Sequence, residues 1–211
     1  MSAAIPELAQ GSWVAFDFDG TLTRRDSLLP FLHQVLGVPA LAAALAAESP
    51  WLAAYATRLL SNEAAKLRVL RRTLGGLARA RLQAEGERFA AEGVAPLLRP
   101  AMMDRLRQHL RAGHRCVLVT ASLTLYTRPW ALGQGFHAVL GSELGFDPAG
   151  RAEGVLVGGN CYGPRKALRL GRLLGGDSLA VGYGDSRGDR EMLAMAQQGF
   201  LLKRRELIRV R

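Results

Sequence analysis

The chain has 211 residues and a mass of 22.8 kDa, which suits one domain, or one core with an inserted segment, rather than two full-sized domains. Apolar residues make up 49% of the sequence and charged residues 22%, a composition that excludes a disordered chain. No run approaches the ~20 consecutive apolar residues of a membrane-spanning helix. The formal net charge of +10 favours anionic partners, and arginine supplies nearly all of the positive charge.

Cysteine usage and the first residues indicate the compartment. The N-terminus has no basic segment followed by an apolar run, so no secretory signal is predicted. Cys116 and Cys161 are too few for a disulfide framework and form no paired metal motif. We therefore expect a cytoplasmic protein with reduced thiols. The segment from Arg58 to Arg115, with thirteen basic and five acidic residues, would also suit peripheral contact with the inner, anionic face of a membrane.

Strands and helices are predicted to alternate along the chain. A buried strand is expected over residues 13–18, and residues 28–95 are expected to be helical because leucines recur at helical spacing among Ala and Arg. Further strands are expected at 116–119, 139–144, 154–158, 179–183 and 199–202, and further helices at 102–110, 166–174 and from 191. Such alternation is typical of an α/β fold with a doubly wound parallel sheet. The long helical segment predicts an inserted, all-helical cap at 25–95, with a core formed by 1–24 and 96–211.

Two pairs of aspartates follow predicted strands. Asp17 and Asp19 stand at positions i and i+2, which place both carboxylates on one side of a strand, and this crowding is unfavourable without a cation between them. Asp185 and Asp189 follow the strand at 179–183. The carboxyl ends of parallel strands line one crevice, so these oxygens are expected to converge. Carboxylate, water and phosphate oxygens are the ligands that Mg²⁺ prefers.

A hydroxyl and an ammonium complete the pattern. Thr120 ends the strand at 116–119, and Lys166 begins a predicted helix. The compact ammonium of Lys166 suits a phosphate oxygen. A lysine in an arginine-rich chain also indicates that this position requires a point charge. Each of these segments alone could be an ordinary turn or a helix cap. Their ordered combination instead indicates one phosphate-binding site.

Four segments resemble the motifs of the haloacid dehalogenase-like (HAD) superfamily, and within it the phosphoserine-phosphatase-like group with a helical cap. They read FDFDGTLT, VLVTAS, NCYGPRK and GYGDSRGD, and they lie within residues 13–193. The resemblance implies a Rossmann-like core, Mg²⁺ as cofactor, and transfer of a phosphoryl group to the first aspartate. It makes the chain a phosphoric monoester hydrolase that acts on a small phosphorylated substrate.

The resemblance implies a role for each matching residue. Asp17 would be the nucleophile and Asp19 the general acid/base, while Thr120 and Lys166 would hold the phosphoryl oxygens. Asp17, the Asp19 carbonyl and Asp185 would bind Mg²⁺. Halide-removing members of the superfamily lack the second aspartate, so dehalogenation is not expected. The supporting positions are Asp189, Gly20, Thr21, Ala121 and Ser122.

The substrate is less well indicated. Asp26 lies nine residues after the nucleophile, where phosphoserine phosphatases carry a Glu, but it would equally serve to cap a helix that starts at Ser27. Ala121-Ser122 and Gly188 stand where those enzymes carry Gly-Gly and Asn, which argues against phosphoserine. We expect arginines on the inner surface of the cap to favour a small anionic ester instead. The candidates are Arg58, Arg68, Arg71 and Arg72.

A phosphoserine phosphatase stays open as an alternative, and three further alternatives stay open beside it. The layout is also similar to the phosphatidylglycerophosphatases of the same subfamily, which makes a phospholipid head-group phosphate a second candidate, with Trp51 and Tyr55 at the membrane interface. A phosphotransferase would pass the phosphoryl group to an alcohol in place of water. A non-catalytic protein that binds anions is the third. Nucleic acid is not expected, because Phe89 is the one aromatic residue in the basic stretch 58–115. The sequence does not indicate the oligomeric state.

Overall fold

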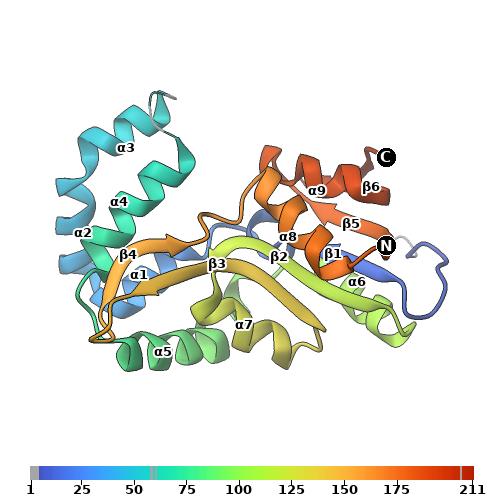
Figure 1. Ribbon diagram of the computed structural model, residues 1–211, viewed down its shortest axis with the longest axis horizontal. Helices are drawn as coiled ribbons and strands as arrows, with labels where there is room; N and C mark the ends of the chain where they lie inside the picture. Colours follow the sequence, from blue (N-terminus) through green and yellow to red (C-terminus); the bar gives the residue numbers. More distant parts are fainter. Residues whose placement is uncertain (1–4, 58, 60, 205) are drawn as a thin grey trace.

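One mixed sheet of seven strands, in the order β4-β3-β2-β1-β5-β6-β7, organises the computed structural model, which describes residues 5–57, 59, 61–204 and 206–211 (Figure 1). The strands are β1 (Trp13–Phe16), β2 (Arg115–Leu123), β3 (Ala138–Phe146), β4 (Ala152–Val157), β5 (Leu179–Gly184), β6 (Ala196–Lys203) and β7 (Glu206–Arg209). The five central strands are parallel, and the two edge strands pair antiparallel to their neighbours. The predicted α/β fold is confirmed, with two antiparallel edges added to the parallel sheet.

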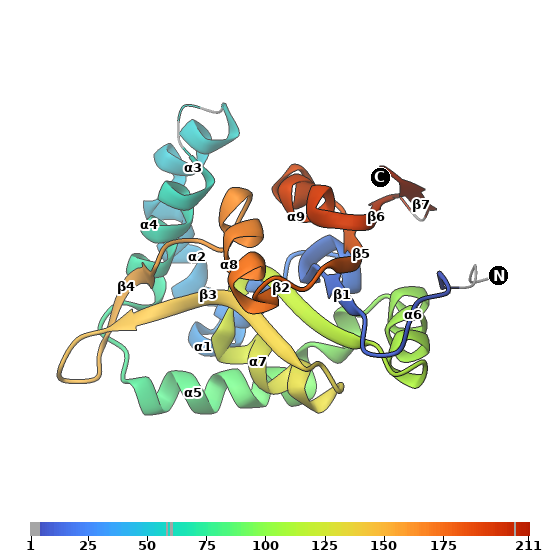
Figure 2. The same cartoon turned by 45° about the vertical axis from the view of Figure 1, so that its right-hand side comes forward.

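Helices cover both faces of the sheet (Figures 1 and 2). Val14 and Phe16 of β1 enter one hydrophobic core together with side chains of α6 (Pro100–Arg111) and α7 (Thr124–Gly133). Trp13 and Ala15 enter a second core with α8 (Pro164–Leu174) and α9 (Arg190–Met195). A parallel strand buried on both faces reads as a continuous apolar run, which is the reason that WVAF predicted a strand.

The regular structure described between β1 and β2 is helical. After a helical turn over Phe18–Leu22 and before α6 come α1 (Leu28–Leu36), α2 (Val38–Ala47), α3 (Ser49–Ala56), α4 (Asn62–Leu74) and α5 (Arg79–Arg88), with short helical turns over Phe89–Gly93 and Ala95–Leu97. Ser61 caps α4, because its side chain accepts a hydrogen bond from the Ala64 N–H at 3.2 Å. α4 lies against β4, and α5 lies against α7, so the helical segment contacts the core at the edge of the sheet. The proposed cap boundaries, 25 and 95, stay a prediction.

Within the described ranges, no single helix has the length and apolar composition to cross a membrane. α1 and α2 reach that length and composition only as a pair, and they are bent by 120° relative to each other at Gly37.

The main differences from the sequence-based prediction concern four elements. β1 ends at Phe16 and not at residue 18, so Asp19 lies in the turn Phe18–Leu22 and does not share one side of a strand with Asp17. β2 continues to Leu123 rather than ending at Val119, although its pairing with β3 is irregular between these two residues. α7 was not predicted, because Pro129 within it reads as a helix break. β7 was not predicted because charged residues dominate the C-terminal sequence. As an edge strand, however, it pairs with β6 alone and tolerates charged side chains along its unpaired edge.

Candidate active site

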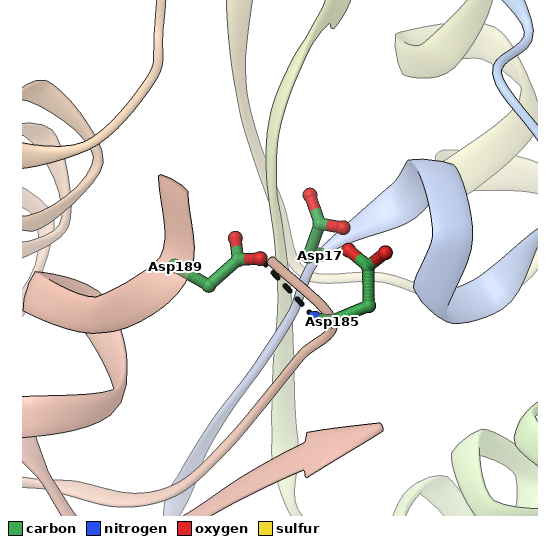
Figure 3. Close-up of side chains that lie close together, drawn as sticks. All are labelled: Asp17, Asp185 and Asp189. Carbon is green, nitrogen blue, oxygen red and sulfur yellow. Dashed lines mark hydrogen bonds between the residues drawn. The ribbon is translucent and has the colours of Figure 1, made fainter. Parts of the chain in front are cut away.

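Three carboxylates converge at the carboxyl ends of the central strands. Asp17 directly follows β1, and Asp185 and Asp189 follow β5 (Figure 3). One oxygen of each lies within 4.8 Å of the others. The Asp17 N–H donates a hydrogen bond to the Tyr183 carbonyl at 2.9 Å, so the pairing of β1 with β5 fixes where this carboxylate stands. The predicted convergence of Asp17, Asp185 and Asp189 is therefore present.

Lys166 supplies the positive charge that faces this cluster. Its ammonium, on the first turn of α8, donates to Asp17 Oδ1 at 2.5 Å and to Asp189 Oδ1 at 2.6 Å. Burial opposes the charge of this 2% exposed residue, but the two carboxylates raise its pKa above the ordinary value, so it stays protonated. The second Asp17 oxygen accepts a hydrogen bond from Thr21 Oγ1 at 3.1 Å. Both oxygens of Asp17 are thus oriented.

The cluster remains short of positive charge. Burial and then Asp189 raise the pKa of Asp17, and the same two causes, in the same order, raise the pKa of Asp185 to about 6. Asp189 Oδ2 is occupied by the backbone N–H groups of Asp185 and Ser186 at 3.2 and 3.0 Å. The Asp185 carboxylate, by contrast, accepts no hydrogen bond from any of the other described residues. Hard oxygens with excess negative charge fit Mg²⁺.

The turn after Asp17 requires glycine. Phe18–Leu22 forms a tight helical turn in which Gly20 has a φ of 84°. A Cβ at Gly20 would overlap the Asp185 carboxylate. Gly20 therefore lets the backbone of this turn pass directly beside the cluster, in a conformation that other residues rarely adopt.

Asp19 stands in a different environment, among hydroxyl and backbone donors. Its Oδ1 accepts a hydrogen bond from the Ser27 N–H at 2.9 Å, and its Oδ2 accepts one from the Ser122 hydroxyl. Burial, and then the charge of Asp26, raise its pKa to about 6. A carboxyl group that titrates near neutrality can both give and take a proton. The Asp19 carbonyl as a metal ligand stays a prediction, since the observed cluster consists of the other three aspartates.

The end of β2 brings its predicted residues to the same space. Thr120 is buried, and its Oγ1 accepts a hydrogen bond from the Ser122 N–H at 2.9 Å. Ser122 contacts Asp19 through its hydroxyl. Ala121, between them, points its carbonyl oxygen to the ammonium of Lys66 at 2.5 Å.

Lys66 was missed by the sequence reasoning. It lies on α4, and its ammonium also donates to Asn160 Oδ1 at 3.3 Å. Burial lowers its pKa to about 8, against the charges of Asp26 and Asp19, which raise it. A signal was available: Lys66 is one of three lysines in an arginine-rich chain, and the argument applied to Lys166 applies to it equally.

The candidate arginines lie elsewhere. Arg68 donates to Glu48 Oε2 at 2.9 Å and its guanidinium lies 4.0 Å from the centre of the Trp51 ring. Arg72 donates to Glu48 Oε1 at 3.2 Å. These residues and Arg71 line a separate pocket between α2, α3 and α4 that includes none of the candidate catalytic residues. Arg68 and Arg72 therefore face the buried Glu48 and not the carboxylate cluster, contrary to the expectation of an arginine-lined inner surface.

Of the remaining residues that the sequence suggested for substrate or membrane contact, the structure describes the side chains of Asp26 and Trp51. Asp26 Oδ1 accepts hydrogen bonds from the N–H groups of Leu28 at 2.8 Å and Leu29 at 3.4 Å. These contacts support the helix-cap interpretation, and substrate contact by Asp26 stays a prediction. Arg58 lies outside the described residues. Trp51 is 45% exposed beneath Arg68, and the side chain of Tyr55 also lies outside what the structure describes.

Comparison with known proteins gives the family. Residues 14–194 match the family model of haloacid dehalogenase-like hydrolases. Protein CicA of Caulobacter vibrioides is 37% identical over 188 residues, which cover 88% of this chain and 83% of CicA. The crystal structure of a protein with unknown function from Bordetella pertussis Tohama I has a TM-score of 0.78 at 26% identity and covers 90% of this chain and 89% of its own. A substrate-bound phosphoserine phosphatase complex has a TM-score of 0.64 at 12% identity, with coverage of 91% and 86%, respectively. The chain therefore belongs to the haloacid dehalogenase-like hydrolase family.

Proposed function

We propose that this protein is a Mg²⁺-dependent phosphomonoesterase that hydrolyses a small anionic phosphate ester through an aspartyl-phosphate at Asp17. The contact of Asp17 with the buried ammonium of Lys166 is the observation that carries the proposal. Beside it lies the carboxylate of Asp185, which forms no ion pair within 4.0 Å with a described residue. The phosphatase among the structures of similar fold supports phosphoryl chemistry on this scaffold. Because every carboxylate of the motif set is in place, a non-catalytic anion-binding protein is the weaker alternative.

Asp17 is the proposed nucleophile. With Thr21 and Lys166 fixing its orientation, one carboxylate oxygen attacks phosphorus while the bond from phosphorus to the alcohol oxygen breaks. Lys166 and the Thr120 hydroxyl hold phosphoryl oxygens in this step. Mg²⁺ bound by Asp17, Asp185 and the Asp19 carbonyl, with Asp189 in support, would supply a Lewis acid that offsets phosphate charge. Covalent attachment divides hydrolysis into two easier steps.

Asp19 is the proposed general acid and base. Protonated at first, it gives its proton to the departing alcohol oxygen. As a carboxylate, it then removes a proton from the water that attacks the aspartyl-phosphate, which releases inorganic phosphate and restores Asp17. Ser27 and Ser122 hold the carboxyl group in place for both transfers. If another alcohol replaced this water, the same residues would perform phosphoryl transfer.

Phosphoserine is the less favoured substrate. Gly188 offers no side chain to a ligand, and a Cβ there would overlap the ring of Tyr162, so the Asn of phosphoserine phosphatases would require this ring to move. Asp26, which would have to bind the substrate amine, already caps α1. A phospholipid head-group phosphate, with peripheral membrane contact, is the second candidate. We propose that residues 25–95 act as a lid that excludes water during transfer.

A substrate screen tests the proposal. Purified protein is incubated with phosphorylated metabolites, phosphoserine and a short-chain phosphatidylglycerophosphate, and released phosphate is measured with Mg²⁺ and with EDTA. We expect EDTA-sensitive turnover that is fastest with a small anionic ester and poor with phosphoserine. Turnover that is insensitive to EDTA, or none with any ester, would contradict the proposal.

Metal binding can be tested without turnover. Because the pKa of Asp185 is raised to about 6, the folded state binds its proton more tightly than the unfolded chain, and stability falls as pH rises from about 4 to 6. Asp185→Asn removes this loss of stability on ionisation, which amounts to about 1 kcal/mol for a partly exposed, solvent-screened group. We expect the metal-free variant to melt about 2–4 °C above the wild type at pH 8 and to show no gain in melting temperature with Mg²⁺. An equal gain in both proteins would exclude Asp185 as a ligand.

A further inference from the structure

Lys66 is an ammonium without an anion. Its two hydrogen-bond acceptors, the Ala121 carbonyl and the Asn160 side-chain amide, are neutral. Among the described residues, no carboxylate oxygen lies within 4.0 Å of its nitrogen, whereas Lys166 has two such partners. A cation withdrawn from water normally requires a paired anion to offset the loss of hydration. Burial lowers the pKa of Lys66, and the charges of Asp26 and Asp19 partly offset this effect. Neither carboxylate contacts the ammonium, so direct pairing is left to a bound anion.

The nearby carboxylates accept hydrogen bonds from groups other than Lys66. Glu63, on the same helix, accepts hydrogen bonds from the Asn160 N–H at 2.9 Å and from Arg165 at 2.6 Å. Asp26 caps α1, and Asp19 is held by Ser27 and Ser122. In the observed arrangement these contacts hold the described carboxylates more than 4.0 Å from the Lys66 nitrogen, so a bound anion is the group that would pair with it directly.

Lys66 lies beside the residues that are proposed to act on the substrate's alcohol. Ala121, its backbone partner, stands between Thr120 and Ser122, and Ser122 holds Asp19. Burial lowers the pKa of Lys66, while the nearby charges of Asp26 and Asp19 raise it. Because Asp19 is the proposed donor to the departing alcohol oxygen, a cation on its side of the site adjoins the alcohol and not the transferred phosphoryl group.

A buried polar network holds Lys66 in this position. Asn160 is 2% exposed, and its Oδ1 also accepts a hydrogen bond from Ser142 Oγ at 3.0 Å. Its Nδ2 donates to Asn62 Oδ1 at 2.9 Å, which fixes the amide with its oxygen toward Lys66. The contacts of Asn160 with Asn62 and Glu63 also attach the start of α4 to the core loop before α8. The ammonium is therefore presented by a fixed support and not by a mobile surface side chain.

We propose that Lys66 binds a second anionic group on the alcohol part of the substrate, so that the site selects phosphate esters whose alcohol carries a carboxylate or a further phosphate. This inference rests on the proposed phosphomonoesterase function and names its specificity-determining residue. It assigns to Lys66 the role that the sequence suggested for the arginines of the same helix.

Matched ester pairs provide the test. Phosphoglycolate is compared with ethyl phosphate, and propanediol bisphosphate with propyl phosphate, so that each pair differs in one anionic group. For each pair we take the ratio of kcat/KM for the anionic ester to kcat/KM for the neutral ester. We expect this ratio to exceed one in the wild type for at least one pair, and the pair with the larger ratio shows whether the second anionic group is a carboxylate or a phosphate. Lys66→Met should lower this ratio of kcat/KM values about 10- to 100-fold, mainly through a higher KM for the anionic ester. The kcat/KM values of the neutral esters should fall much less than those of the anionic esters.

Two further variants complete the design. Lys66→Arg keeps the charge and should restore part of the preference. Arg68→Met removes a positive charge from the same helix at a residue that contacts Glu48 and Trp51, and it should leave the ratio unchanged. An unchanged ratio in Lys66→Met, or an equal loss in Arg68→Met, would overturn the inference while the phosphomonoesterase function stood. Failure of the wild type to hydrolyse any of the esters would instead overturn that function, and the inference with it.

Discussion

Asp17→Asn is expected to abolish phosphate release, with a loss of about four orders of magnitude or more in kcat, because an amide cannot attack phosphorus. The variant should fold normally. Asn is nearly isosteric with Asp, its carbonyl oxygen can still accept the Lys166 hydrogen bond, and its amide can donate to Thr21 Oγ1, which donates to Asp17 in the wild type. It also removes one charge from a crowded cluster. Activity is measured as phosphate release with Mg²⁺, and folding as the melting temperature.

A covalent readout separates the nucleophile from the acid/base. After acid quenching during turnover, mass spectrometry of the wild type should show a phosphoryl group on the peptide that contains Asp17. Asp19→Asn should accumulate more of this adduct with an aryl phosphate, whose leaving group needs no proton, because the variant cannot activate the water of the second step. If Asp17→Asn kept more than a tenth of the wild-type turnover, or still formed the adduct, Asp17 would not be the nucleophile.

Sequence and structure agree best where local patterns suffice. The apolar run of β1 predicted a strand buried on both faces, and the aspartates that follow β1 and β5 were expected to meet because parallel strands end at one edge. Lys166 was recognised because its helix follows a motif and its residue type is rare in this chain. These inferences need the order of the elements, but not their packing.

The helical segment could not be read in the same way. Arg68 and Arg72 were expected to face substrate, but their partner is Glu48, twenty or more positions away, which becomes buried only when α2 and α4 pack together. Lys66 acquires its role because α4 meets the end of β2 and the loop before α8, contacts of 55 and 94 positions in sequence separation. Composition shows that cations are present, whereas tertiary packing decides which of them reaches the site.

Lys166→Met is expected to have the largest effect on stability. Removing a 2% exposed ammonium leaves the buried Asp17 and Asp189 carboxylates facing each other without a counter-ion, and breaking a buried ion pair in this way costs about 3–5 kcal/mol. For a chain of this size the loss corresponds to a fall of about 10 °C in melting temperature. Phosphatase activity should also disappear, because the variant lacks the charge that we propose to hold the phosphoryl oxygens.

The pH dependence of this loss distinguishes missing charge from missing packing. Without Lys166 the pKa of Asp17, already raised by burial, rises further above that of the unfolded chain, so stability is present at low pH and is lost as pH rises through the folded-state pKa. In urea unfolding, the free energy of unfolding of Lys166→Met should therefore lie slightly below that of the wild type at pH 5 and far below it at pH 8. Lys166→Met/Asp189→Asn removes one of the two repelling carboxylates and should recover part of the stability at pH 8 without recovering activity. A deficit that is equal at both pH values would mean that Lys166 supports the fold through its aliphatic chain, and that the carboxylates of the site do not depend on its charge.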